Sequence, residues 1–148
     1  MEKSSFCRLI EKRVRKDLRL RELFKKNDVI YVKDSLSRLF IDLIVGELPK
    51  KFTKDPKKAN KIVVKYTMDD KCNDFIEKLF YKKEKKAWKG ISVLETITDK
   101  EALLFARYNN IKFIPNKKDE KTKEMLDKLE NMYPQTRFSI SRSIDSLK

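Results

Sequence analysis

Apolar residues recur every three or four positions along much of the chain, and this spacing predicts several amphipathic helices. The first predicted helix runs from Ser5 to Lys26, with Phe6, Leu9, Ile10, Val14, Leu18 and Leu23 on one side and basic residues on the others. The next helix is expected after Asp34 or Ser35, either of which could cap it. Further helices are expected from Asp69 to Lys86, after a capping box at Thr98–Glu101, from Lys123 to Tyr133 and from Thr136 to Leu147.

Two short runs rich in β-branched residues predict strands, at Asp28–Val32 and at Ile62–Tyr66. The polar, lysine-rich stretch from Pro49 to Lys61 is expected to be an exposed loop, and Ile111–Pro115 a short extended piece. A strand followed by a capped helix is half of a βαβ unit. We therefore expect an α/β fold, with a small, partly parallel sheet flanked by helices in one domain spanning residues 1–148.

The composition adds a strong positive charge to this picture. The 148 residues include 37 Lys plus Arg against 23 Asp plus Glu, a formal net charge of +14. Such an excess favours a nucleic-acid partner, because a basic surface gains affinity by releasing the counterions of phosphates. An anionic membrane surface, or a charged surface that serves solubility alone, are the alternatives. No apolar run is long enough for a membrane span, so we expect a cytoplasmic protein without a membrane partner.

Few residues suggest catalysis. The chain has no histidine, and its two glycines, Gly46 and Gly90, do not form a phosphate-binding motif, so neither a cofactor nor a metal is expected. Cys7 is a weak catalytic candidate, because the neighbouring Arg8, Lys12 and Arg13 would lower the pKa of its thiol. The alternative is that Cys7 is only a small apolar residue at the edge of a helix.

Three segments, in order along the chain, resemble one family. The first comprises Ser4-Ser5-Phe6-Cys7, the basic helix that follows, and the strand and turn from Asp28 to Arg38. The second is Val93-Leu94-Glu95-Thr96-Ile97-Thr98-Asp99-Lys100-Glu101-Ala102-Leu103-Leu104-Phe105-Ala106. The third is Leu129-Glu130-Asn131-Met132-Tyr133-Pro134-Gln135-Thr136-Arg137-Phe138-Ser139-Ile140. Together they resemble the PP-loop ATPases that thiolate the wobble uridine of tRNA. The resemblance implies the fold of the C-terminal half of an adenine nucleotide α-hydrolase domain.

The chain departs from the family's pattern at the positions that carry chemistry. The family's Ser-Gly-Gly-x-Asp-Ser pyrophosphate loop is absent, and no cysteine follows Phe113-Ile114-Pro115 where the family has a catalytic one. In the loop after the first strand, Asp34 falls at the family's histidine, and Ser37 and Arg38 fall at its pair of carboxylates. The resemblance therefore implies a tRNA-binding protein without catalytic activity that assists tRNA 2-thiolation.

Under this interpretation the partners are tRNA or another RNA, together with a catalytic thiolation subunit or a second copy of the chain. The residues expected to contact nucleic acid are Arg8, Lys12, Arg13, Arg15, Lys16, Arg19 and Arg38. A second basic helix from Lys78 to Lys86 could also follow phosphates.

Other functions remain open. The chain could be a protein-interaction module that completes a partner's α/β domain, with Phe40, Phe52 and Trp88 as contact residues. A residual enzyme that uses Cys7 as a nucleophile or sulfur carrier is a further alternative. A DNA-binding helix-turn-helix is disfavoured, because no tight turn joins two short helices.

Overall fold

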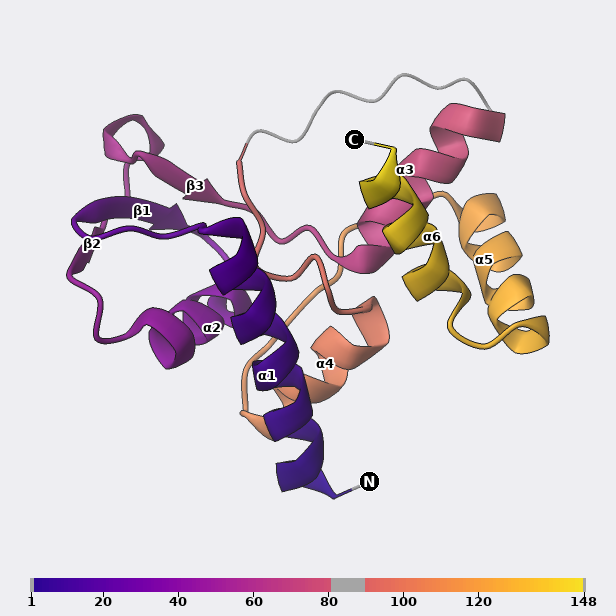
Figure 1. Ribbon diagram of the computed structural model, residues 1–148, viewed down its shortest axis with the longest axis horizontal. Coiled ribbons are helices and arrows are strands. Elements are labelled where there is room, and N and C mark those ends of the chain that lie inside the picture. Colours follow the sequence, from indigo (N-terminus) through magenta and orange to yellow (C-terminus); the bar gives the residue numbers. More distant parts are fainter. Residues whose placement is uncertain (1, 81–89, 148) are drawn as a thin grey trace.

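The computed structural model describes residues 2–80 and 90–147, with a short sheet at one end of the molecule and a group of helices at the other (Figure 1). The elements in chain order are α1 (Lys3–Arg21), β1 (Asp28–Val32), α2 (Ser35–Val45), β2 (Lys50–Phe52), the 3-10 turn η1 (Pro56–Lys58), β3 (Lys61–Val63), α3 (Met68–Phe80), α4 (Asp99–Tyr108), α5 (Glu120–Met132) and α6 (Thr136–Ser146). The expected α/β fold, with a small parallel sheet flanked by helices, is confirmed.

The three strands are all parallel and lie in the order β2-β1-β3. Asp28 is paired with Lys50 across one side of β1, and Tyr31 with Ile62 across the other. The expectation of a loop throughout Pro49–Lys61 is wrong, because this stretch contains β2 and η1. A three-residue strand that carries two lysines gives almost no periodic signal, and its pairing with β1 stabilises it.

Near Ile91 the chain returns to the sheet and forms one parallel bridge with Val63. The Ile91 amide donates to the carbonyl of Ile62 at 2.8 Å. Gly90 precedes this bridge with φ of 140°, and a Cβ there would lie 2.5 Å from the Ile62 oxygen. This position therefore requires glycine, both for its φ and for the close approach of two backbones.

The main core lies between the sheet and helices α1, α2 and α4. It contains Ile10, Val14 and Leu18 from α1, Ile30 from β1, Leu36, Phe40 and Ile41 from α2, and Ala102, Phe105 and Ala106 from α4. The Phe40 and Phe105 rings are stacked with their centroids 4.6 Å apart. Phe40 is fully buried in this core, so the expectation that it contacts a partner protein is wrong.

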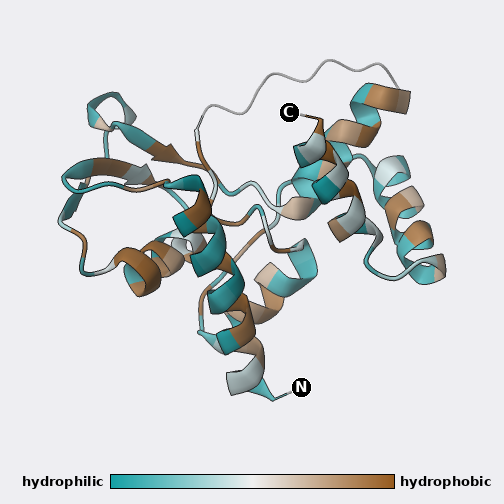
Figure 2. Cartoon of the chain, viewed as in Figure 1, coloured by the Kyte–Doolittle hydropathy of each residue, from teal (hydrophilic) through white to brown (hydrophobic). Residues whose placement is uncertain are grey.

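A second, smaller cluster, the helical core, joins α3, α5 and α6. Its buried members are Met68, Cys72 and Ile76 from α3 and Leu126 from α5. Figure 1 shows these three helices side by side, beyond α4 and away from the sheet. Apolar residues are interspersed with polar ones along each of these helices, as the sequence pattern predicts for amphipathic helices (Figure 2).

Helix boundaries agree with the sequence signals where these are local. Asp34 caps α2 by accepting from the Ser37 amide at 2.9 Å, and the Thr98–Glu101 capping box begins α4.

Other boundaries differ from the expectation. The first helix ends at Arg21, where Glu22 adopts a left-handed conformation, rather than at Lys26. No strand forms at residues 111–115. The expected helix from Asp69 to Lys86 begins at Met68 and is described as far as Phe80, while its remainder and Trp88 lie outside the described residues.

Within the described part of the chain, no helix has both the length and the apolar composition needed to cross a bilayer.

Candidate nucleic-acid interface

Helix α1 presents a row of cations to solvent on the side opposite its buried face. The row, called the α1 row below, consists of Arg8, Lys12, Arg15, Lys16 and Arg19, all exposed. At about 3.6 residues per turn, these positions fall within a strip roughly 100° wide and roughly 16 Å long. None of the five has an ion-pair partner among residues 2–80 and 90–147.

The α1 row is held in place by the opposite face of the same helix. Ile10 and Val14 are completely buried and Leu18 nearly so, against the main core. Apolar residues four apart lie on one face of a helix, so the sequence determines which side turns outward. Five of the seven residues expected to contact nucleic acid therefore lie together on one exposed surface.

Arg13 does not belong to this row. Its guanidinium contacts both carboxylate oxygens of Glu101 at 2.8 Å and the carbonyl oxygen of Thr96 at 3.3 Å. Its guanidinium carbon also lies 5.2 Å from the centre of the Phe138 ring. This ion pair, in which Nη1 contacts both carboxylate oxygens, joins α1 to α4, so Arg13 contributes to the packing of the two helices.

Arg38 lies on a different element from the α1 row. Its guanidinium carbon is 3.4 Å from the centre of the Phe52 ring, and its Nε lies 3.4 Å from an Asp42 oxygen. Phe52 is half-buried beneath it and packs against the main core. Arg38 is half-exposed, and these contacts fix it against the sheet edge as a cation–π pair.

The environment of Cys7 differs from the expectation. Burial raises the pKa of its thiol above the ordinary value of 9.0, and the charge of Glu11 raises it further, whereas an amide hydrogen bond from Asn109 and the charge of Lys3 lower it. The prediction of a lowered thiol pKa is therefore wrong, because burial and Glu11 outweigh the cations nearby. A thiol with a raised pKa is a poor nucleophile at neutral pH.

The turn between β1 and α2 is the place where a doubly wound α/β fold holds phosphate groups. Here the carboxylate of Asp34 occupies the helix N-terminus, accepting from the Ser37 amide. Ser37 itself is buried. No glycine lies in this turn, so its backbone cannot fold around a phosphate as a glycine-rich loop does. A capping carboxylate also repels an anion at the same amides.

A crevice of about 650 Å³ opens beside this turn, at the carboxyl ends of β1 and β3. Lys33, Lys65 and Lys112 line it together with Asp34. The Lys65 ammonium donates to the Ile114 carbonyl at 2.7 Å, which leaves Lys33 and Lys112 as its exposed cations. Small ligands of open α/β sheets bind in crevices at this edge, where neighbouring connections run in opposite directions.

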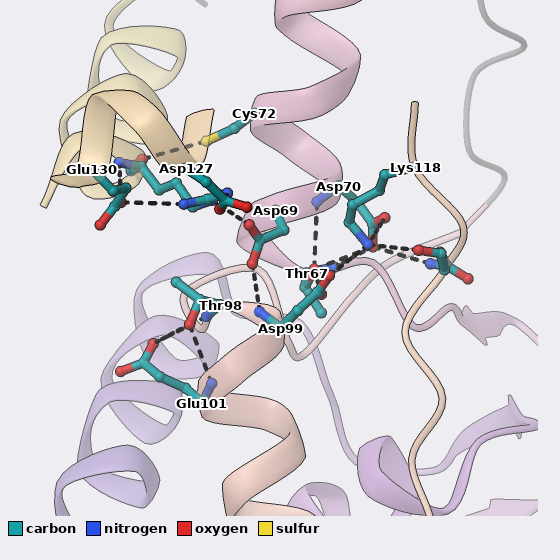
Figure 3. A network of polar contacts seen from close by, with 12 residues as sticks. Thr67, Asp69, Asp70, Cys72, Thr98, Asp99, Glu101, Lys118, Asp127 and Glu130 are labelled. Carbon is teal, nitrogen blue, oxygen red and sulfur yellow. Dashed lines mark hydrogen bonds and ion pairs between the residues drawn. The ribbon is translucent and has the colours of Figure 1, made fainter. Parts of the chain in front are cut away.

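A buried ionic network lies behind this crevice, at the start of α3 (Figure 3). Two adjacent carboxylates, Asp69 and Asp70, begin the helix and are both buried. The Lys118 ammonium lies 3.1 Å from Asp70 and 2.6 Å from Asp99. Asp69 is ion-paired with Arg137, which also contacts Asp127 at 2.7 Å. Figure 3 shows Lys118 and Asp69 on opposite sides of the first turn of α3.

The network alters the protonation of its members. Burial lowers the pKa of Lys118, but its hydrogen bond to Asp99 and the charge of Asp70 outweigh burial and raise that pKa above 10.5. Burial raises the pKa of Asp99 above 3.8, although Lys118 and Thr67 act in the opposite direction. In the sequence resemblance, the family's pair of carboxylates falls at Ser37 and Arg38 after β1, and neither of these residues is a carboxylate. An intact adjacent pair instead follows β3, and two internal cations neutralise it.

No protein-family model and no curated protein matches the chain. In three dimensions, the chain is similar to the U34-tRNA thiolase NcsA from Methanococcus maripaludis, whose structure contains a [4Fe-4S] cluster. The TM-score is 0.68 and the sequence identity 18%, over 98% of this chain and 79% of that chain. This chain has the fold of a tRNA thiolase.

The [4Fe-4S] cluster of that thiolase does not fit the residues of this chain. Cysteine thiolates hold such clusters, usually four of them, and this chain has two cysteines. Cys7 packs against the main core, whereas Cys72 lies in the helical core, where burial and the charge of Asp69 raise its thiol pKa to about 12. The described residues include no group of three or more His, Cys, Asp or Glu that could hold a metal.

Proposed function

We propose that this protein binds RNA, with tRNA as the expected RNA, through the α1 row, and that it assists tRNA thiolation without performing the ATP-dependent chemistry. The observation that carries the proposal is the set of five exposed cations without acidic partners among the described residues. Cations that are not paired internally can replace the counterions of RNA phosphates, and this exchange supplies most of the affinity in such complexes.

The choice of tRNA thiolation as the process rests on the fold. NcsA, which shares this fold over 98% of the present chain, is a tRNA thiolase. A protein with a thiolase fold and a basic helix is suited to bind the same class of RNA. A catalytic thiolation subunit, or a second copy of the chain, is the partner that this proposal requires.

The non-catalytic part of the proposal rests on the turn after β1 and on the cysteines. Asp34 caps α2 at the position where phosphate groups bind in related α/β folds, and the turn contains no glycine. Both thiols have raised pKa values. A chain with these features lacks both a pyrophosphate cradle and an activated cysteine.

The RNA-binding proposal is tested by titrating fluorescently labelled tRNA with the protein at several salt concentrations. Engagement of all five cations of the α1 row by phosphates predicts a log Kd against log salt slope of about 3.5 to 4.5. Absence of binding at low salt, or an affinity that does not depend on salt, would refute it.

The non-catalytic part needs separate measurements. Equilibrium dialysis with ATP and Mg²⁺ is expected to show no saturable binding at micromolar nucleotide. Pull-down of the tagged protein from its native cell is expected to recover a thiolation enzyme. Saturable ATP binding with release of pyrophosphate in the presence of tRNA would overturn this part and leave RNA binding intact.

A further inference from the structure

A groove of about 1210 Å³ lies beside the C-terminal half of α1. One wall is α1 and the connection that follows it, and the other is the end of α2 with the connection to β2. The lining includes the basic residues Arg15 and Arg19, the apolar residues Phe24 and Leu43, and the acidic residues Asp42 and Glu47.

The groove is continuous with the α1 row. Arg15 and Arg19 belong to the row and also line the groove, so a polyanion that follows the row reaches the groove at its end. Lys25 lines the groove as well and is exposed. Glu22 also lines this side, but the three cations outnumber it, so phosphates are attracted to the α1 side of the groove.

The rest of the groove is lined by apolar side chains and carboxylates. Its lining includes apolar residues from both walls, among them Phe24 and Leu43, and the Leu43 side chain is 41% exposed. Asp42 and Glu47, on the α2 side, place carboxylates across from the arginines. Carboxylates accept hydrogen bonds from the exocyclic amino groups of bases, and apolar surfaces bind the faces of unstacked bases.

We propose that this groove binds one unstacked nucleobase that carries an exocyclic amino group, from an RNA whose backbone follows the α1 row. The base lies against Leu43 and Phe24, its phosphate faces Arg15 and Arg19, and its amino group donates to Asp42 or Glu47. This inference rests on the RNA-binding function proposed above and adds the part of the RNA that is recognised. Unpaired nucleotides in loops and bulges are the RNA elements that present such bases.

The variant Leu43→Ser removes apolar surface from the groove without changing charge, and Leu103→Ser on α4 is its matched control, because Leu103 is 42% exposed. Affinity is measured for an RNA hairpin with a cytidine loop and for a blunt duplex with the same number of phosphates. Leu43→Ser is expected to weaken hairpin binding on the order of fivefold and to leave duplex binding unchanged. Leu103→Ser should change neither affinity.

The double variant Asp42→Ala/Glu47→Ala tests recognition of the amino group. The readout is the ratio of affinities for hairpins with cytidine and uridine loops, since loss of two negative charges strengthens binding to both. The wild-type protein should prefer the cytidine loop by about threefold or more, and the double variant should show no preference. Circular dichroism of every variant verifies that it is folded.

The outcomes separate this inference from the proposed function. If the wild-type protein binds neither RNA at low salt, RNA binding itself fails. If it binds both RNAs with the expected salt dependence and Leu43→Ser changes neither affinity, the groove inference alone is overturned. Equal affinity of the wild-type protein for cytidine and uridine loops overturns it too. It is also overturned if Leu43→Ser leaves hairpin binding intact but dissociates a dimer in sedimentation, because the groove is then a contact between copies.

Discussion

The α1 row and the cations of the buried ionic network are the same residue types in opposite environments. Arg8, Lys12, Arg15, Lys16 and Arg19 lie in solvent, whereas the side chains of Lys118 and Arg137 are buried near the start of α3. Each of these two buried cations has at least two carboxylate partners, and the α1 row has none in the described part of the chain. In the network, cations and carboxylates neutralise one another. The excess positive charge of the chain therefore lies on the surface.

A net charge of +14 does not by itself show which cations can bind phosphates. That depends on which of them already have a carboxylate partner within the protein. A buried cation with paired carboxylates stabilises one arrangement of the chain, and removing it leaves a charge stranded in the interior. An exposed cation contributes little to stability, but it remains available to a phosphate. Substitutions in the two regions should therefore affect different measurements.

The largest effect is expected at Arg137. Replacement by alanine leaves Asp69 buried without its cation and removes contacts with Asp127 and Glu130. We expect a loss of about 3 to 5 kcal/mol in the free energy of unfolding, measured with urea. Arg142→Ala, on the exposed side of the same helix, should cost no more than about 0.5 kcal/mol. Equal effects of the two substitutions would contradict the role of the network.

Lys118→Met is expected to cost slightly less, about 3 kcal/mol, because Asp99 is partly exposed and can be protonated. The pH dependence has a defined sign. The pKa of Lys118 is raised above 10.5 in the folded protein, so its contribution to stability is present below that value and is lost as the pH rises through the folded pKa.

The pH dependence is best measured with Lys118→Arg, whose charge persists at alkaline pH. The unfolding free energy of the wild-type protein should fall relative to that of Lys118→Arg as the pH rises above 10.5. Parallel pH profiles of the two proteins would show that Lys118 does not carry this dependence.

Arg13 lies on the same helix as the α1 row but is paired with Glu101 inside the protein. It therefore separates the effect of position on α1 from the effect of exposure. Arg13→Ala should lower the free energy of unfolding by about 1 kcal/mol, since it breaks a half-buried ion pair with Glu101. It should leave the slope of the RNA salt titration unchanged. Arg15→Ala is the matched control, with no loss of stability and a slope reduced by about 0.7 to 0.9.

The smallest effect concerns the thiols. Alkylation of Cys7 by iodoacetamide should accelerate only above pH 9.0, because its pKa is raised. Cys72, with a thiol pKa of about 12, should react only when the protein unfolds. Rapid alkylation of Cys7 at pH 7 would contradict the environment described for it and would revive a nucleophilic role.

The features predictable from sequence are the local ones. The strand at Asp28–Val32, the Asp34 cap and the Thr98–Glu101 capping box depend on residues within a few positions of one another, and each occurs as expected. Helix periodicity also indicated the outward side of α1, although it did not separate Arg13 from the row. The carboxylate of Glu101, far away in sequence, determines the position of that side chain.

The features that sequence did not predict depend on distant partners. β2 exists because Lys50–Phe52 is paired with β1, and neither its length nor its composition signals a strand. The network joins Asp69 and Asp70 to Lys118 and Arg137 from later parts of the chain. In the sequence these four residues are indistinguishable from the surrounding lysines and carboxylates, because burial alone gives them their role.

The central claim is that the α1 row, and not the overall charge, binds RNA. The most direct measurement compares Lys12→Gln/Arg15→Gln/Lys16→Gln with a control that removes the same charge from α5, Lys121→Gln/Lys123→Gln/Lys128→Gln, whose three lysines are all exposed. Labelled tRNA is titrated with each protein across a range of salt. We predict that the α1 variant reduces the log–log slope by about 2 to 3, whereas the α5 variant leaves it nearly unchanged. Equal reductions in the two variants would contradict the claim.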